Sequence, residues 1–184
     1  VLRPELIEKI GLLFLKHPDP APFWVAVGDA KGKERVRRMF IEAARWPDDS
    51  KFTHNDQVAW HSARWAIVAD DAAAEAREAA AARHGKPAGQ AIDALVLNFN
   101  VMANPEASPT ERARALSWVL HIVGDIHQPM HVSDLFSTDF PAGNAAATLS
   151  YVDDPMTETT IPLHSLWDSN VMRSPTLDEV TRFA

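Results

Sequence analysis

Apolar side chains recur at intervals of three and four residues along most of the chain, the spacing of helices with one buried face. After Pro4, the stretch ELIEKIGLLFLK has this spacing and predicts a helix that ends at HPDPAP. The stretch KERVRRMFIEAA at 33–44 predicts a second helix, which Pro47 should end. An alanine-rich helix closed by Gly85 is expected at 70–85, and another helix at 90–102.

The most complete helix start lies at SPTE. Ser108 is expected to cap the helix, Pro109 to be its first residue, and Glu111 to bond back to the cap. This helix should run from about Pro109 to His127 and stop before Pro129.

The pattern changes after His131. Residues 131–161 resemble a loop, with one short strand expected at 148–152, and LHSLWDSNVM then returns to helical spacing. A further helix is expected from about Pro175. The pattern leaves the type of the segment WHSARWAIVAD open. We therefore predict an all-α fold, a single domain over residues 1–184 with one long loop.

Composition excludes several classes of protein. No apolar run approaches the roughly 18 residues of a membrane span. The chain has no cysteine, which excludes disulfides, thiolate metal sites and a thiol nucleophile. Its formal charge is −7, whereas proteins that bind nucleic acid through phosphate contacts alone are usually basic. A nucleic-acid role would need another source of positive charge, which bound divalent metals would supply.

The chain contains two histidine–aspartate pairs, His121 with Asp125 and His164 with Asp168. Within each pair the two residues are four positions apart, which places them one turn apart on the same face of a helix. One such pair is commonly a surface hydrogen bond, but here both pairs lie among apolar residues, where an aspartate is costly unless it is paired or bound to a cation. Imidazole and carboxylate together suit zinc. Three further residues offer the same chemistry: Asp48, His61 and His131.

These residues carry a resemblance. HIVGDIHQPMH followed by LHSLWD, with WPD and WH upstream, resembles the zinc-dependent single-strand nucleases of the S1/P1 type, which are related to zinc-dependent bacterial phospholipases C. All fixed positions of H-x-x-G-D-x-H-Q-P-x-H are present, and the resemblance spans Arg3 to Met172. It implies a mostly helical fold with up to three zinc ions. It also implies cleavage of RNA and single-stranded DNA, 3′-nucleotidase activity, a secreted or periplasmic location and no stable protein partner.

The resemblance also assigns residues. It places one zinc on Asp48, His61, His121 and Asp125, and a second on His131, His164 and Asp168. Asp48 and Asp125 would be catalytic, orienting a bridging hydroxide, and Asp125 would also reach a third zinc. Asp49 is an alternative to Asp48, but the tryptophan–small residue–aspartate pattern favours Asp48. His127 is expected to support the site or to cap the helix, and Asn144 and Phe136 to contact substrate.

The chain departs from the family pattern in three places. It begins at Val1, without the tryptophan and nearby histidine that bind the third zinc, and it ends at Ala184, where relatives continue. The glycine-glycine-asparagine loop is kept only in part, as Ala142-Gly143-Asn144. We expect His17 to be a helix-end residue and not a replacement ligand. Without cysteine, a bacterial-type member is expected.

Two alternatives stay open: a phospholipase C that uses the same ligands, and a metal-binding relative that has lost activity with the third site.

Overall fold

The computed structural model describes residues 3–171, and backbone contacts group them into two compact units. Within the described residues, the first unit combines 3–61 with 90–125, and the second combines 62–89 with 126–171. The described part is mostly helical, as predicted, with strands of three or four residues. The helix expected from Pro175 lies outside the described residues.

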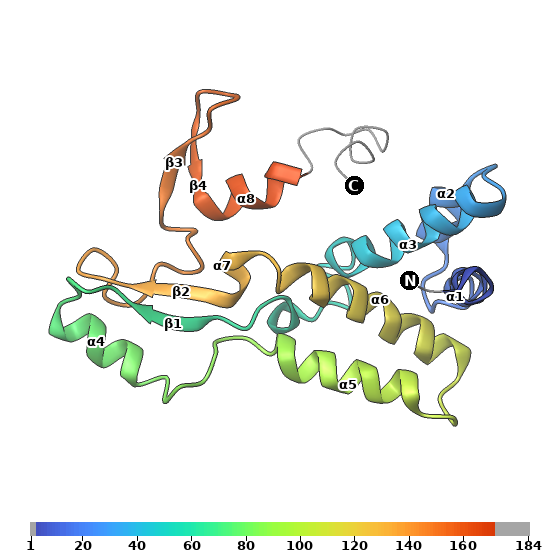
Figure 1. Cartoon of the computed structure of the whole chain (residues 1–184), viewed down its shortest axis with the longest axis horizontal. Coiled ribbons are helices and arrows are strands. Elements are labelled where there is room, and N and C mark those ends of the chain that lie inside the picture. The colour runs from blue at the N-terminus through green and yellow to red at the C-terminus, as the bar shows by residue number, and fades with distance from the viewer. Residues whose placement is uncertain (1–2, 172–184) are drawn as a thin grey trace. The chain divides into compact units, whose positions relative to one another are not determined.

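The first unit is a helical assembly around α6 (Pro109–Asp125), which packs against α3 (Gly32–Asp49), α5 (Ala91–Ala103) and α1 (Pro4–Phe14) (Figure 1). α2 (Ala21–Val27) lies against α3. A short 3-10 helix, η1 (Val58–His61), ends the first of the two stretches that make up this unit. Aromatic side chains fill the centre, with Trp46 and Trp118 edge to face at 6.2 Å between ring centroids. Burial of such large rings stabilises the packing of these helices.

Helix α3 corrects one prediction, because it continues through Pro47 to Asp49. Proline lacks the N–H that would bond the carbonyl of Ala43, but its fixed φ is helical. The loss falls in the last turn, where Trp46 and Pro47 are both buried and hold the helix in place. Asp48 therefore lies in the last turn of α3 and not beyond the end of the helix.

The start of α6 forms as predicted. The backbone N–H of Glu111 donates to Ser108 Oγ at 3.2 Å, and the N–H of Ser108 donates to Glu111 Oε2 at 2.8 Å. This reciprocal pair satisfies two backbone donors that the helix leaves free. The helix ends at Asp125, two residues earlier than expected.

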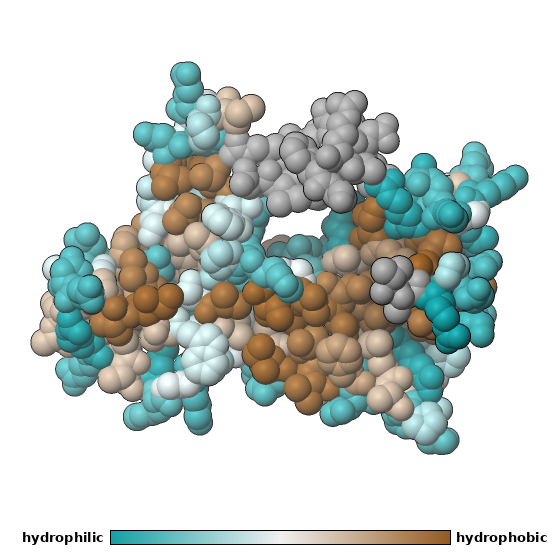
Figure 2. All heavy atoms as spheres, in the orientation of Figure 1, coloured by the Kyte–Doolittle hydropathy of each residue, from teal (hydrophilic) through white to brown (hydrophobic). Residues whose placement is uncertain are grey.

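One face of α5 is apolar and exposed. Ile92, Val96 and Phe99 recur at helical spacing and are each about half exposed. Figure 2 shows brown, hydrophobic surface over this helix. The other face carries Ala91, Ala94 and Asn98, which are buried.

The second unit contains the strands. β1 (Trp65–Val68) and β2 (Ser133–Phe136) pair in parallel, with Trp65 opposite Ser133, and α4 (Ala74–Ala81) packs on them. Short helix α7 (Pro129–Val132) leads directly into β2. β3 (Tyr151–Asp153) and β4 (Thr160–Pro162) form an antiparallel pair that leads into α8 (Leu163–Val171) (Figure 1).

The region predicted as loop is therefore more ordered than expected. β2 and β4 were not predicted, and the strand expected at 148–152 begins only at Tyr151. A small core of Ala72, Ala76, Ala80 and Phe136 joins α4 to the parallel strands β1 and β2. The small alanine side chains let α4 lie close to the strands, with the Phe136 ring as the one large group.

Candidate metal centre

The first candidate metal group belongs to the first unit and gathers Asp48, His61 and His121. Asp48 comes from the last turn of α3, His61 from the end of η1, and His121 from α6. Asp125, one turn after His121, lies beside them: its Oδ2 is 3.0 Å from His121 Nε2 and 3.2 Å from His61 Nδ1. The structure thus brings together all four residues expected at one zinc.

A backbone carbonyl determines which nitrogen of His121 faces this group. Nδ1 lies 2.8 Å from the carbonyl oxygen of Ala44 in α3. A carbonyl can only accept, so Nδ1 carries the hydrogen and Nε2 points at the cluster. Nothing in the residue type of Ala44 could have indicated this contact from sequence.

Charges around the first group are balanced by Lys51. Its Nζ lies 2.7 Å from Asp48 Oδ1. Burial lowers the pKa of Lys51, but the hydrogen bond to Asp48 and the nearby carboxylates outweigh burial and raise the pKa. Burial likewise lowers the pKa of His121, but its hydrogen bond to Asp125 and that carboxylate's charge outweigh burial, so this pKa is raised.

Asp49 is turned to a different partner. Its Oδ2 accepts from Arg45 Nε at 2.8 Å along α3, whereas Asp48 Oδ1 lies 3.6 Å from His61 Nδ1. The geometry thus supports Asp48 over Asp49 as the residue that faces the cluster.

The second candidate metal group belongs to the second unit and consists of His131 from α7 with His164 and Asp168 from α8. His164 Nε2 is 3.2 Å from Asp168 Oδ2, and His131 Nε2 is 3.8 Å from Asp168 Oδ1. The two imidazole rings stack, with centroids 5.0 Å apart. Gln128 Nε2 also donates to Asp168 Oδ1 at 2.8 Å.

Hydrogen bonding holds Asp168 in its charged form. Burial raises the pKa of this carboxyl, but hydrogen bonds from His131, His164 and Gln128 outweigh burial and hold the pKa well below its usual range. The same bond to Asp168 raises the pKa of His164. His164 Nδ1 donates to the carbonyl of Ala146 at 2.8 Å, so here too Nε2 faces the cluster.

Both groups fit zinc by their donor chemistry. Two ligand atoms held at about 2.05 Å by a tetrahedral zinc lie roughly 3.3 Å apart. The facing nitrogen and oxygen atoms lie 2.8 to 3.8 Å apart in the first group and 3.2 to 3.8 Å apart in the second. Histidine nitrogens oriented by carbonyls are also the usual arrangement around a bound metal.

A scan of known families agrees with this chemistry: the model described as S1/P1 nuclease matches residues 25–182. The chain belongs to the S1/P1 nuclease family. All seven candidate ligands fall inside the matched region.

Two curated relatives match. Nuclease S1 of Aspergillus oryzae is 35% identical over 85 residues, which are 46% of this chain and 25% of the relative. Endonuclease 2 of Arabidopsis thaliana is 27% identical over 164 residues, 82% of this chain and 52% of the relative. The chain thus spans between a quarter and about half of the curated relatives it matches. No solved structure matches. A bacterial origin stays a prediction.

The two residues expected to contact substrate, Phe136 and Asn144, are both buried. Phe136 is 2% exposed, within the core that packs on α4, and Arg83 lies 4.7 Å from its ring centroid. A ring buried in this way offers no face to a base, so the structure does not support substrate stacking by Phe136. Asn144 is also buried: its Oδ1 accepts from the backbone of Leu135, and its Nδ2 donates to Ser150 Oγ. These bonds give Asn144 a structural role.

His17 and His127 are members of neither candidate metal group. His17 follows α1 and is 3% exposed, beside Phe23 and Trp46, which agrees with a helix-end residue. His127 is exposed in the turn between α6 and α7, and its supporting role stays a prediction.

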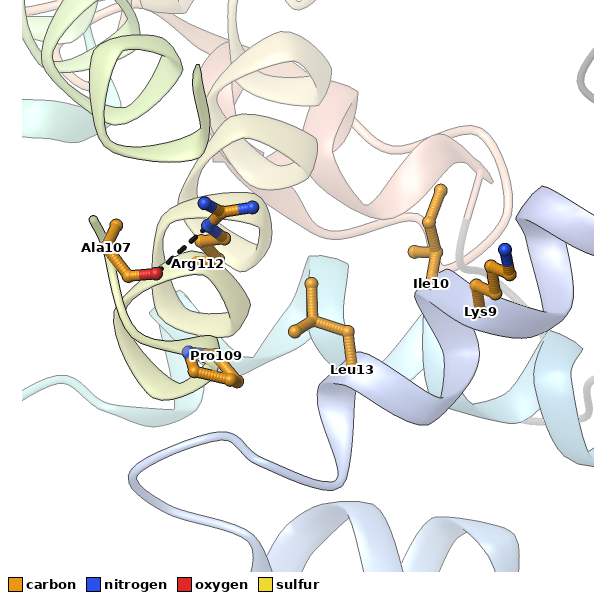
Figure 3. Close-up of a pocket in the computed structure, with 6 residues that line it drawn as sticks. All are labelled: Lys9, Ile10, Leu13, Ala107, Pro109 and Arg112. Carbon is orange, nitrogen blue, oxygen red and sulfur yellow. Dashed lines mark hydrogen bonds between the residues drawn. The ribbon is translucent and has the colours of Figure 1, made fainter. Parts of the chain in front are cut away.

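The hollow in Figure 3, between α1 and the start of α6, is lined mainly by aliphatic side chains and contains none of the candidate ligands. Within residues 3–171, no helix combines the length and the hydrophobicity needed to cross a membrane.

Proposed function

We propose that this chain carries the metal-binding part of a zinc-dependent nuclease that hydrolyses phosphodiester bonds in single-stranded DNA and RNA, with 3′-nucleotidase activity. The observation that carries the proposal is the pair of histidine–aspartate groups, each with Nε2 of an α-helical histidine turned inward by a carbonyl. Membership of the S1/P1 nuclease family supports it. The names of both relatives describe nucleases.

Asp48, His61, His121 and Asp125 would hold one zinc, and His131, His164 and Asp168 a second. Bound zinc makes hydroxide available near neutral pH and neutralises charge on phosphate oxygens. The residues around the groups orient the ligands: Ala44 and Ala146 set the histidine tautomers, and Gln128 holds Asp168. Lys51, beside Asp48, adds a positive charge suited to a phosphate.

Bound zinc ions also explain how an acidic chain could bind nucleic acid, which is itself negatively charged. A chain with net charge −7 repels nucleic acid at long range, but zinc ions concentrate positive charge at the ligands. A single strand can bend to bring one phosphate to such a point, which a stiff duplex resists. A secreted or periplasmic location and a third zinc belong to the same proposal, by resemblance to the family, which implies no stable protein partner.

The test compares Asp125→Asn with Asp49→Asn. Both change one aspartate to its amide near the first group, but only Asp125 faces the two histidines. We expect Asp125→Asn to lower zinc affinity and hydrolysis of denatured DNA by more than about 100-fold, since ligand loss exceeds the 10–100-fold effect of supporting residues. Asp49→Asn should change neither.

Zinc content and the substrate that is hydrolysed are measured separately, because they test different parts of the proposal. Unchanged zinc content and unchanged hydrolysis in Asp125→Asn would overturn the ligand assignment. If the wild-type protein binds zinc and cleaves phosphatidylcholine but not denatured DNA, it is a phospholipase C. If it binds zinc and cleaves neither, the catalytic proposal fails and the metal assignment stands.

A further inference from the structure

Three consecutive alanines before β3 have a left-handed backbone. Ala145, Ala146 and Ala147 have φ of 50°, 58° and 62°. For residues with a Cβ this conformation costs roughly 1–2 kcal/mol each. Such strain persists only where the surroundings fix it, and an observed outlier points to a functional constraint. We call residues 145–147 the alanine turn.

Asp134 holds the alanine turn from within the second unit. It is 3% exposed, and its Oδ1 accepts the backbone N–H of Ala146 at 3.1 Å. Its other oxygen, Oδ2, accepts from Arg83 Nη2 at 2.6 Å. A buried carboxylate is costly unless it is paired and hydrogen-bonded, and Asp134 has both kinds of partner.

The approach of the loop to Asp134 depends on a glycine. Gly143 has φ of +93°, and a Cβ there would lie 3.1 Å from the Phe136 ring and 3.3 Å from Asp134 Oδ1. Arg83 is itself fixed, since its Nη1 donates to the carbonyl of Arg64 at 3.2 Å and its guanidinium covers the Phe136 ring. The ion pair is therefore a rigid support next to the turn.

The other side of the alanine turn faces the second metal group. The carbonyl of Ala146 accepts from His164 Nδ1 at 2.8 Å, and the backbone N–H of His164 donates to the carbonyl of Ala147 at 3.5 Å. Both ends of the Ala146 backbone are thus occupied, the N–H by Asp134 and the carbonyl by His164. One strained residue connects the Arg83–Asp134 ion pair to a candidate metal ligand.

We propose that Arg83 and Asp134 are positioning residues for the second metal group: through the alanine turn they fix the His164 imidazole with hydrogen on Nδ1 and with Nε2 free for a metal. The inference rests on the proposed role of His164 as a ligand. It assigns a function to a strained turn and a buried ion pair that the ligand set does not use.

The direct test measures the tautomer of neutral His164 in metal-free protein by ¹⁵N NMR, at a pH above the raised pKa of His164, where the ring carries a single hydrogen. His164→Gln assigns the signal. We expect the form with hydrogen on Nδ1 in the wild type and a mixture of forms in Asp134→Ala. The control is Asp153→Ala, which removes an exposed aspartate of β3 whose partner is Thr160. A neutral wild-type His164 that carries its single hydrogen on Nε2 would overturn the proposal without any variant.

Zinc affinity, measured by competition with a chelator, gives the second readout. Asp134→Ala should weaken one zinc site by 10–100-fold, the range for lost supporting contacts, and Asp153→Ala should weaken none. Asp134→Asn keeps an oxygen for the Ala146 N–H but loses the charge. We expect it to retain the Nδ1–H form and to weaken zinc binding less than Asp134→Ala does, because the contact to Ala146 is kept while the ion pair with Arg83 is lost.

The two Asp134 variants separate positioning from simple stability. If Asp134→Asn folds but loses zinc affinity as strongly as Asp134→Ala, the ion pair acts without the turn and the relay through Ala146 is wrong. If Asp134→Ala does not fold, the wild-type tautomer and Asp134→Asn still decide the question. Neither readout uses substrate, so failure of the nuclease proposal alone would leave both unchanged.

Discussion

His17 should make the first unit sensitive to acid. Its ring is 3% exposed, packed against Phe23 and against Trp46 at 4.3 Å between centroids. Nδ1 is within 3.1 Å of the backbone of Asp19, and Nε2 is buried without a hydrogen-bond partner among the described residues. Burial lowers the pKa of His17 from 6.5 to about 4, although the bond to Asp19 acts in the opposite direction.

The sign of the effect follows from proton binding. Between pH 6.5 and pH 4 the unfolded chain protonates His17 and the folded chain does not, so stability falls as the pH falls. A difference of about 2.5 units at 1.36 kcal/mol per unit sets a limit of roughly 3.4 kcal/mol. The loss should reach about 2 kcal/mol at pH 5 and about 3 kcal/mol at pH 4.

The assay is urea unfolding of metal-free protein, followed by tryptophan fluorescence, for wild type and His17→Asn at several pH values. Asparagine offers an amide near the position of Nδ1 but does not titrate. The missing ring leaves a cavity that lowers stability at every pH, so the slope and not the absolute value is compared. His121, whose pKa shifts in the opposite direction, is present in both proteins and cancels.

We expect the wild type to lose about 3 kcal/mol more than His17→Asn between pH 7 and pH 4. His54→Gln removes an exposed histidine and is the matched control, expected to follow the wild type. Parallel profiles for wild type and His17→Asn would refute the reasoning, because they would mean that buried His17 protonates as readily as it does in the unfolded chain.

Two further variants test the local structure. Ser108→Ala removes the cap of α6 and should lower the free energy of unfolding by about 1 kcal/mol. Thr110→Ala, at an exposed position of the same turn, should change it by less than about 0.5 kcal/mol. Equal effects of the two substitutions would contradict the capping assignment. Asn144→Ala leaves the partly buried backbone N–H of Leu135 without its acceptor and should cost about 1–3 kcal/mol in urea unfolding. A higher KM at unchanged stability would instead restore a substrate role for Asn144.

Local signals predicted the helices best. The cap at Ser108, the apolar spacing of α1 and the return to helix at Leu163 all depend on residues close in sequence. α2 was not predicted, because Pro20 precedes it, Pro22 lies in its first turn and Gly28 follows it. Prolines and glycines so close together usually indicate a loop. The parallel pair β1 and β2 was missed since its strands are 68 residues apart at Trp65 and Ser133, and no local spacing records such pairing.

The metal groups show where reasoning from sequence stops. Spacing alone placed His121 with Asp125, and His164 with Asp168, on one face of a helix, and the structure keeps both arrangements. Spacing does not say which ring nitrogen faces the metal. That choice depends on a carbonyl from another element, Ala44 in one group and Ala146 in the other, and a backbone carbonyl has no residue signature.

The two groups therefore share one construction: a histidine–aspartate pair on a helix, a further histidine from another element, and a carbonyl behind the helical histidine. They differ in what fixes the carbonyl. Ala44 lies inside α3, where helical hydrogen bonds determine its direction without cost. Ala146 lies in a strained turn, which needs the Arg83–Asp134 ion pair to hold it. The second group is thus the one whose metal affinity should respond to substitutions far from its ligands, and the first should respond mainly to changes in the ligands themselves.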